Sequence, residues 1–531
     1  MAKHLDEKSK GWIWWGVALV IAAFVVTAAV LTIRHKKHSH HQSSSPGAIS
    51  QKYDQALKVA LTFFDIQKAG KLPADNPVSW RGDSALKDGQ DVRADLSKGM
   101  YDAGDHIKFG LPMAFTATVL SWAVLEYGDR MEAANANTKA DAQDAIKWIT
   151  DYLINAHPSP NVLYVQVGNA TLDHQCWERP ESMKEERPTL QVDTSIPGSD
   201  VAAETAAAMA SASLVFRKTD SAYADKLIQH AEQLFQFADS YRGLYSHNIP
   251  SIQIFYNSTG YKDDLLWAAA WLYHATHNET YLNYVSTENG QTFARWGAAP
   301  TWFSWDDKHA GVQVLLGRIR FFGSKTVSSE VNVNLEQYRK TARDIMCAFL
   351  PNSPTATTNR TDGGLLWITE WNAIQHGVNS AFLAVIFSDY MSTAGIETFK
   401  CGDKSFSSQD LRMFASSQAD YILGENPMSM SYLVGYGKKY PEQVHHRGAS
   451  IPVDASTGNG CKSGFLWFNA TSQNPNVATG ALVGGPFQND SFTDLRSNSM
   501  QNEPTTYNSA GLVGLLSGLL TTSSLTQSFS S

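Results

Sequence analysis

The chain has 531 residues, of which 43% are hydrophobic and 11% aromatic, so it can bury a large core in one domain or several. Its formal net charge is -8, and no basic patch interleaved with aromatic residues occurs beyond the N-terminus, which argues against a nucleic-acid partner and allows a neutral substrate. The four cysteines form no CxxC pair, so we expect neither a zinc ribbon nor a dense disulfide framework, and one or two disulfides stay open.

The first feature along the chain is an uncharged, mostly apolar segment at residues 12–33. A helix of this length can cross a bilayer core of about 30 Å, so we predict a transmembrane anchor. A cleaved signal peptide is the alternative, but its apolar region would be shorter, about 7–15 residues. Residues 1–11 would then be a cytosolic tail, and residues 34–49, rich in His and Ser, a polar stalk.

Beyond the stalk, ten segments repeat apolar residues with helical spacing, and strand-like alternation is scarce. Long loops rich in Gly, Pro and Trp connect them and are expected to carry function. No linker divides residues 50–531, so we predict one all-α domain built as a closed array of helical hairpins. The predicted helices are residues 53–68, 114–127, 138–155, 200–216, 222–240, 263–276, 335–350, 375–391, 409–423 and 505–520.

A short loop before the second predicted helix contains two acids. Residues 99–113, GMYDAGDHIKFGLPM, place Asp102 and Asp105 three residues apart beside glycines. Either aspartate could simply cap the helix. The loop also carries His106 and Lys108 beside aromatic residues, and this mixture favours a functional loop in which the two acids hold a water.

A third acid, Glu503, stands near the other end of the chain, just before a proline and the last predicted helix. The helix dipole would lower its pKa. To act as a general acid, Glu503 would need apolar burial or a neighbouring carboxylate, for which Asp494 and the aspartate pair are candidates. Because hydrolysis of an acetal needs two carboxyl functions, these segments could supply both.

Between the two acidic segments lie side chains suited to sugar hydroxyls and sugar faces. His445, His446 and Arg447 offer hydrogen-bond donors, and adjacent histidines do not have the spacing of a zinc site. Aromatic side chains in the loops could stack on sugar rings, although each is as readily a core residue. They include Trp177, Tyr256, Trp302, Trp305, Trp367 and Trp371.

Seven motifs, in order along the chain, together resemble the family-9 glycoside hydrolases, the plant-type endo-β-1,4-glucanases. The resemblance covers about residues 50–521, and with the N-terminal anchor the chain looks like the membrane-bound subgroup. The motifs are WRGDS (80–84), YDAGDHIKFGLPMAF (101–115), DHQCWERPE (173–181), PGSDVAAETAAA (197–208), YNSTGYKDDLLWAAAWLY (256–273), the segment 445–447 and QNEPT (501–505).

The resemblance implies an (α/α)6 barrel and inversion at the anomeric carbon, with Asp105 as the water-activating base, Asp102 sharing the water and Glu503 as the acid. It also implies sugar contacts from His174, Tyr256, Trp302, His445 and Arg447. We add Trp177 and Asp494 as candidate substrate contacts, from the loop aromatics and the neighbourhood of Glu503.

The resemblance requires no cofactor but raises the question of a structural calcium ion, which some relatives hold. The matching residues here are Asp263, Asp264 and Asp307, and Asp264 stands where the family has Glu, so calcium is left open. Two further departures are Ser499, an aromatic residue in the family, and Ser509, an Asn in the family. They put efficiency and substrate preference in doubt more than the reaction type.

We therefore predict endo-hydrolysis of β-1,4-glucosidic bonds in cellulose or a related cell-wall glucan, with a weakly active or inactive glucan-binding protein as the alternative. Lys and Arg are nearly balanced on the two sides of the anchor, so charge does not orient it. Its orientation is instead predicted from a non-cytosolic substrate and from the sequons, which all follow the anchor. We predict a single-pass type II protein of the plasma membrane or secretory pathway. The sequons begin at Asn169, Asn257, Asn278, Asn359, Asn469 and Asn489.

Overall fold

The computed structural model describes residues 48–322, 328–455, 461–522 and 525. The predicted tail and anchor, and the stalk up to residue 47, lie outside the described residues. Residues 49–531 form a packed unit of their own. Within the described ranges, no helix combines the length and the apolar character that a membrane span requires.

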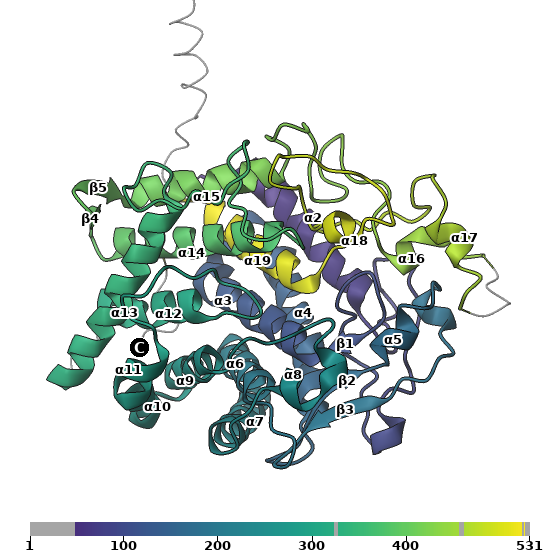
Figure 1. Ribbon diagram of the computed structural model, residues 1–531, viewed down its shortest axis with the longest axis horizontal. Coiled ribbons are helices and arrows are strands. Elements are labelled where there is room, and N and C mark those ends of the chain that lie inside the picture. The colour runs from purple at the N-terminus through teal and green to yellow at the C-terminus, as the bar shows by residue number, and fades with distance from the viewer. Residues whose placement is uncertain (1–47, 323–327, 456–460, 523–524, 526–531) are drawn as a thin grey trace, which may run out of the picture. The chain divides into compact units, whose positions relative to one another are not determined.

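Six helices form a closed inner ring, in which each packs against the next and the last packs against the first (Figure 1). Nearly every side chain of these helices is buried, because the ring interior covers one side and an outer layer covers the other. In ring order they are α3 (Gly110–Ala134), α6 (Ser199–Phe216), α9 (Lys262–Thr276), α12 (His309–Phe322), α14 (Ile374–Thr393) and α19 (Thr506–Leu519).

Six outer helices alternate with the inner ones along the chain. Each has one apolar side against the ring and one polar side toward solvent, the pattern expected of a covering layer. This double ring is an (α/α)6 barrel and confirms the predicted fold of the catalytic region. The outer helices are α2 (Gln51–Gln67), α4 (Ala136–Ala156), α7 (Ser221–Ser240), α10 (Glu279–Ser286), α13 (Ser329–Phe349) and α15 (Ser408–Ile422).

Two barrel helices, α10 and α12, were not predicted from the sequence. The eight residues of α10 are too few to establish a periodicity. Helix α12 contains Gly311 and Gly317, which weaken the helical signal. Gly311 is required by packing, because an added Cβ would lie 2.5 Å from the ring of Phe303.

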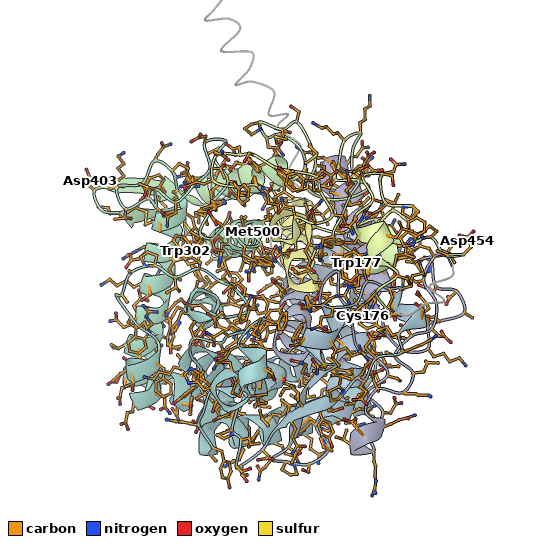
Figure 2. The ribbon with its side chains drawn as sticks, turned by 45° about the vertical axis from the view of Figure 1, so that its right-hand side comes forward. Cys176, Trp177, Trp302, Asp403, Asp454 and Met500 are labelled. Carbon is orange, nitrogen blue, oxygen red and sulfur yellow. A yellow bond between two sulfur atoms is a disulfide. The ribbon has the colours of Figure 1, made fainter. Side chains whose placement is uncertain are left out.

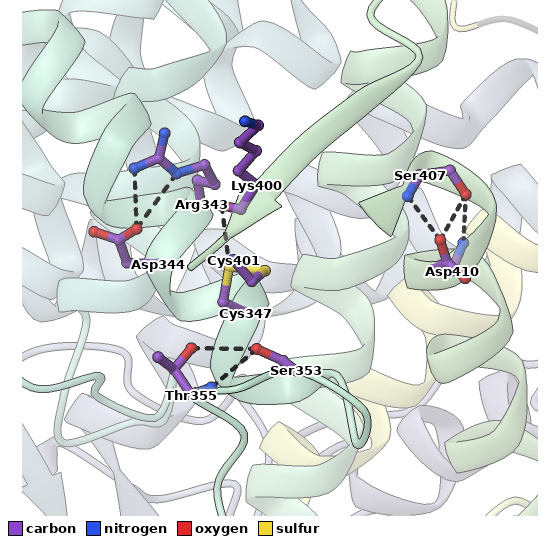
Figure 3. Close-up of a disulfide and its surroundings, with 9 residues drawn as sticks. All are labelled: Arg343, Asp344, Cys347, Ser353, Thr355, Lys400, Cys401, Ser407 and Asp410. Atoms are coloured by element: carbon purple, nitrogen blue, oxygen red, sulfur yellow. Dashed lines mark hydrogen bonds and ion pairs between the residues drawn. A yellow bond between two sulfur atoms is a disulfide. The ribbon is translucent and has the colours of Figure 1, made fainter. Parts of the chain in front are cut away.

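The connections contain two small antiparallel sheets and two disulfides. Strands β1 (Lys108–Phe109), β2 (Leu163–Val167) and β3 (Thr189–Val192) pair in that order, and β4 (Thr398–Cys401) pairs with β5 (Lys404–Ser407). Cys347–Cys401 ties this hairpin to α13 (Figure 3), and Cys176–Cys461 joins two loops. Short helical turns are η1 (Gln90–Val92), α5 (Ala170–Asp173), η2 (Pro180–Ser182), α8 (Tyr245–Asn248), η3 (Pro250–Ile252), α11 (Glu288–Phe293), α16 (Arg447–Ser450), α17 (Phe465–Phe468) and α18 (Ser499–Asn502).

Candidate active site

The loop that carries both aspartates is fixed by two neighbouring helices of the barrel. From the end of α2, the side-chain amide of Gln67 donates to the carbonyl oxygens of Tyr101 (3.0 Å) and Ala103 (2.6 Å). At the start of α19, the backbone N–H of Thr506 donates to the carbonyl oxygen of Asp102 at 3.0 Å. The loop is therefore held by an outer and an inner helix, which limits its freedom.

Three segments distant in sequence meet at Gly104. Its N–H donates to Glu503 Oε1 at 3.2 Å, and its carbonyl accepts from the N–H of Arg447 at 3.1 Å. A Cβ at this position would lie 1.9 Å from the carbonyl oxygen of His445, so only glycine permits the approach. The aspartate loop, the segment 445–447 and Glu503 thus form one site.

Asp102 is a buried carboxyl that contacts a tyrosine. The hydroxyl of Tyr256 donates to Asp102 Oδ2, whereas Oδ1 has no hydrogen-bond partner among the described residues. Burial, and then the charge of Asp105, raises the pKa of Asp102 well above its usual value. The two aspartates therefore do not readily ionise together.

Asp105 is held between opposing charges. Burial and the nearby Asp173 raise its pKa to about 6, while His174 and Arg447 act in the opposite direction. His174 Nε2 lies 3.9 Å from Asp105 Oδ2, with its other ring nitrogen 2.7 Å from the carbonyl oxygen of Ala170. Above pH 6, Asp105 is ionised and can accept a proton.

Glu503 is a buried carboxyl with two other carboxyls acting on it. Burial, then Asp105, then Asp102 raise its pKa well above the usual value, against the Gly104 N–H and Arg447. The requirement found in the sequence, burial together with neighbouring carboxylates, is met. The raised pKa favours the protonated carboxyl, the form that a general acid needs.

The side chains around the acids are also fixed. His445 Nδ1 lies 2.6 Å from the carbonyl oxygen of Arg496, and burial lowers the His445 pKa to about 4, so the ring is neutral. Its Nε2 lies 3.9 Å from Glu503 Oε1. Arg447 Nη1 pairs with Asp173 Oδ1 at 2.7 Å. This arrangement presents an imidazole nitrogen and a guanidinium beside the acids.

The predicted aromatic residues differ in how deeply they are buried. Trp302 is half-buried and stacks on Phe349 with ring centroids 6.1 Å apart. Trp177 is only 3% exposed, and it packs edge-on against His445 at 5.0 Å. In the view of Figure 2, Trp302 and Trp177 lie on either side of Met500. Trp177 therefore supports His445 instead of offering an open ring face.

Asp494 was expected to contact substrate or to raise the pKa of Glu503, but the structure gives it other partners. Its carboxylate accepts from the backbone N–H groups of Glu442 (2.7 Å) and Gln443 (3.0 Å) and from the side-chain amide of Asn502 (2.9 Å). It is not among the groups that raise the pKa of Glu503. Asp494 joins the segment before His445 to the residue before Glu503.

Sequence reasoning missed two residues that shape the site. Asp173 pairs with Arg447 and raises the pKa of Asp105, and its place directly before His174 in the motif was the available signal. Tyr507 packs near Tyr256, with centroids 6.4 Å apart, and its hydroxyl accepts from Asn372. No local pattern distinguishes Tyr507 from any other tyrosine in an apolar helix.

Of the three acids considered for calcium, Asp263 and Asp307 each have an oxygen within 4.8 Å of the other and of a His309 ring nitrogen, whereas Asp264 pairs with a lysine. Asp264 Oδ1 lies 2.9 Å from the ammonium group of Lys308, and Asp263 Oδ2 accepts from the Lys308 N–H at 2.6 Å. Asp307 Oδ1 accepts from the His309 N–H at 2.9 Å and lies 2.8 Å from its Nδ1. Calcium takes six to eight oxygens, and these carboxylates face cations or N–H groups, so the fit is poor and calcium stays a prediction.

Comparison with known proteins places this geometry in a family. The model for glycosyl hydrolase family 9 matches residues 53–516. The chain belongs to glycosyl hydrolase family 9. Endoglucanase 24 from Oryza sativa subsp. japonica is 60% identical over 99% of this chain and 100% of its own length. Endoglucanase 10 from Arabidopsis thaliana is also 60% identical, with the same coverage.

Solved structures of family 9 share the fold. An endoglucanase from the termite Nasutitermes takasagoensis has a TM-score of 0.78 and 40% identity, covering 89% of this chain and 99% of its own. The cellulase Cel9M of C. cellulolyticum, solved with cellobiose, has a TM-score of 0.73 and 31% identity with the same coverage. The family 9 barrel thus extends over the body of this chain.

Proposed function

We propose a division of roles for the inverting endo-hydrolysis of β-1,4-glucan by this family 9 chain: Glu503 protonates the glycosidic oxygen, and Asp105 takes a proton from the attacking water. The observation that supports this most is that different charges surround the two acids, Asp105, which follows Gly104, and Glu503, which accepts from the Gly104 N–H. Two aspartates raise the pKa of Glu503 against the Gly104 N–H and Arg447, whereas one aspartate raises the pKa of Asp105 against both His174 and Arg447. One acid keeps its proton and the other gives it up.

Asp102 completes the water site in this proposal. The Tyr256 hydroxyl fixes one of its oxygens, and the other is free to contact a water that Asp105 activates. Trp305 packs edge-on against Tyr256 at 4.8 Å and restrains the ring. The orientation of the water therefore depends on two aromatic side chains as well as on two acids.

The substrate contacts are proposed from the same geometry. His174 is exposed beside Asp105, and Trp302 is half-buried, so both are accessible to a glucan chain. His445 and Arg447 lie at the acids and would hold hydroxyl groups of the sugar being cleaved. Cellulose and other β-1,4-linked cell-wall glucans fit this set of neutral and cationic donors.

Activity on soluble glucan tests the function as a whole. The full chain should release reducing ends from carboxymethyl-cellulose, and NMR of the first product should show the α-anomer. The β-anomer appearing first would mean retention and would remove the base role from Asp105. Glucan binding without any release of reducing ends would instead support the non-catalytic alternative.

We also propose that residues 12–33 anchor the chain in a membrane, with the barrel outside the cytosol. Two features support this: both disulfides suit an oxidising compartment, and every sequon asparagine except Asn169 is exposed. Endoglycosidase should increase gel mobility of the chain made in secretory cells. In sealed microsomes, added protease should spare the barrel. A barrel digested there would place it in the cytosol.

A further inference from the structure

His106 follows Asp105 directly but has no role in the site described above. Its ring is 2% exposed and packs against Tyr101, with centroids 5.3 Å apart. Neither ring nitrogen has a hydrogen-bond partner among the described residues. Burial, then Arg447, lowers the pKa of His106 well below its usual value, so the ring is neutral and keeps a lone pair. A buried lone pair without a partner is unfavourable unless something binds it.

Two carboxylates converge on this ring. One oxygen each of Asp173 and Glu185 lies within 4.8 Å of a His106 ring nitrogen, and within 4.8 Å of the other oxygen. Asp173 is at the end of α5, and Glu185 is in the loop after η2. Asp173 is 1% exposed, whereas Glu185 is only half-buried, so an ion could enter from the Glu185 side.

A further acid lies beside the Glu185 carboxyl. Burial and the adjacent Glu185 raise the pKa of Glu178 to about 8. Glu178 is 3% exposed, and its Oε1 has no hydrogen-bond partner in the described part of the chain. Arg447 is paired with Asp173, and Arg187 also acts on His106. With its proton in place Glu178 adds no charge, so Asp173 and Glu185 supply the carboxylate donors of the cluster.

We propose that His106, Asp173 and Glu185 form a binding site for a divalent transition-metal ion beside the catalytic base. One imidazole nitrogen and two carboxylate oxygens are a donor set for Zn²⁺ or Mn²⁺, with water filling the remaining positions. Bonds of about 2.0–2.2 Å require the three donor atoms, which lie within 4.8 Å of one another, to move closer together. Calcium, which takes oxygen ligands, does not match the imidazole.

Zinc binding to the full chain in detergent micelles tests the site. His35, His38, His40 and His41 of the stalk are changed to serine in every sample, because a histidine-rich tract could itself bind zinc. Excess calcium is present throughout. We expect one zinc per chain by equilibrium dialysis, and a visible absorption band when Co²⁺ replaces Zn²⁺.

The variants separate this site from others. His106→Asn should weaken zinc binding at least tenfold, and so should Glu185→Gln, whose half-buried position tolerates the change if His106→Asn does not fold. Asp307→Asn, in the separate acidic group, should bind zinc like the parent. The proposal is overturned if the parent binds no zinc, or if both site variants bind it as tightly as the parent. Neither readout depends on glucanase activity.

Discussion

Two of the clusters of buried acids in the described part of the barrel differ in the charges that act on them. In one, the Lys308 ammonium lies 2.9 Å from Asp264 and 3.5 Å from Glu204. In the other, Asp105 raises the pKa of Asp102, and both aspartates raise the pKa of Glu503. In the first cluster a lysine lies close to both acids, whereas in the second the carboxyls raise one another's pKa and the arginine, Arg447, is paired with Asp173.

The two clusters therefore have different roles, one structural and one catalytic. Burial raises the pKa of Glu204 to about 7, and Lys308 opposes that rise. The same lysine donates to the carbonyl oxygen of Trp305, whose ring packs against Tyr256. At Asp102 and Glu503 the neighbouring aspartates add to the effect of burial, which favours the protonated carboxyls. The cluster with the lysine supports the barrel, and the cluster of mutually raised carboxyls carries the chemistry.

The largest expected effect is on rate. Asp105→Asn should lower kcat on carboxymethyl-cellulose by about 10²–10⁴-fold, because the variant lacks the general base. Its unfolding free energy should not fall, since the change removes a repelling carboxyl. Glu425→Gln, at an exposed carboxyl, is the matched control. An inactive variant that is also strongly destabilised would contradict the separation of the two clusters.

The next effect is on stability. Lys308→Met should lower the free energy of unfolding by about 3–5 kcal/mol, because it leaves Glu204 and Asp264 buried without a cation. Urea denaturation measures it, with the exposed Lys340→Met as control. A loss below 1 kcal/mol would show that the lysine does not compensate these acids.

The pH dependence follows from the raised pKa of Asp105. The pKa is about 6 in the folded chain and 3.8 in the unfolded reference, so the folded state binds more protons between these values. Stability contributed by Asp105 therefore falls as pH rises from about 4 to 6. Over the same range the rate should increase as the base ionises. Asp105→Asn should flatten part of the stability change, measured by denaturation at several pH values.

A smaller effect is expected at Tyr256. Tyr256→Phe removes the hydroxyl that donates to Asp102, so kcat should fall about tenfold while the barrel remains folded. Tyr152→Phe is the control, because the Tyr152 hydroxyl has no hydrogen-bond partner among the described residues. Equal losses in both variants would point to a general packing effect.

The smallest effect concerns calcium. Removal of calcium with EGTA should shift the melting temperature by less than about 2 °C, because Lys308 and His309 already face the three candidate acids. Calorimetry with and without calcium measures the shift. A decrease of 10 °C or more would show that calcium is a structural component and that the acids rearrange to hold it.

Much of the barrel was predictable because helical periodicity is local. Ten of the twelve barrel helices were predicted, and the motifs located Asp102, Asp105 and Glu503. The burial of Trp177 and the backbone contacts of Asp494 were not predictable, because they depend on segments that meet only in the folded chain. The same holds for Lys308, whose partners come from two other helices.

Leaving-group dependence tests the central assignment most directly. The dinitrophenolate of a dinitrophenyl β-cellotrioside leaves without being protonated, whereas cleavage of a glucosidic bond in cellopentaose needs an acid to protonate the leaving oxygen. Glu503→Gln should therefore slow the hydrolysis of cellopentaose by about 10²–10⁴-fold and that of the dinitrophenyl substrate by less than tenfold. Asp105→Asn should slow the hydrolysis of both. If Glu503→Gln slows both substrates equally, Glu503 is not the general acid, and the contrast between the two acid clusters has another origin.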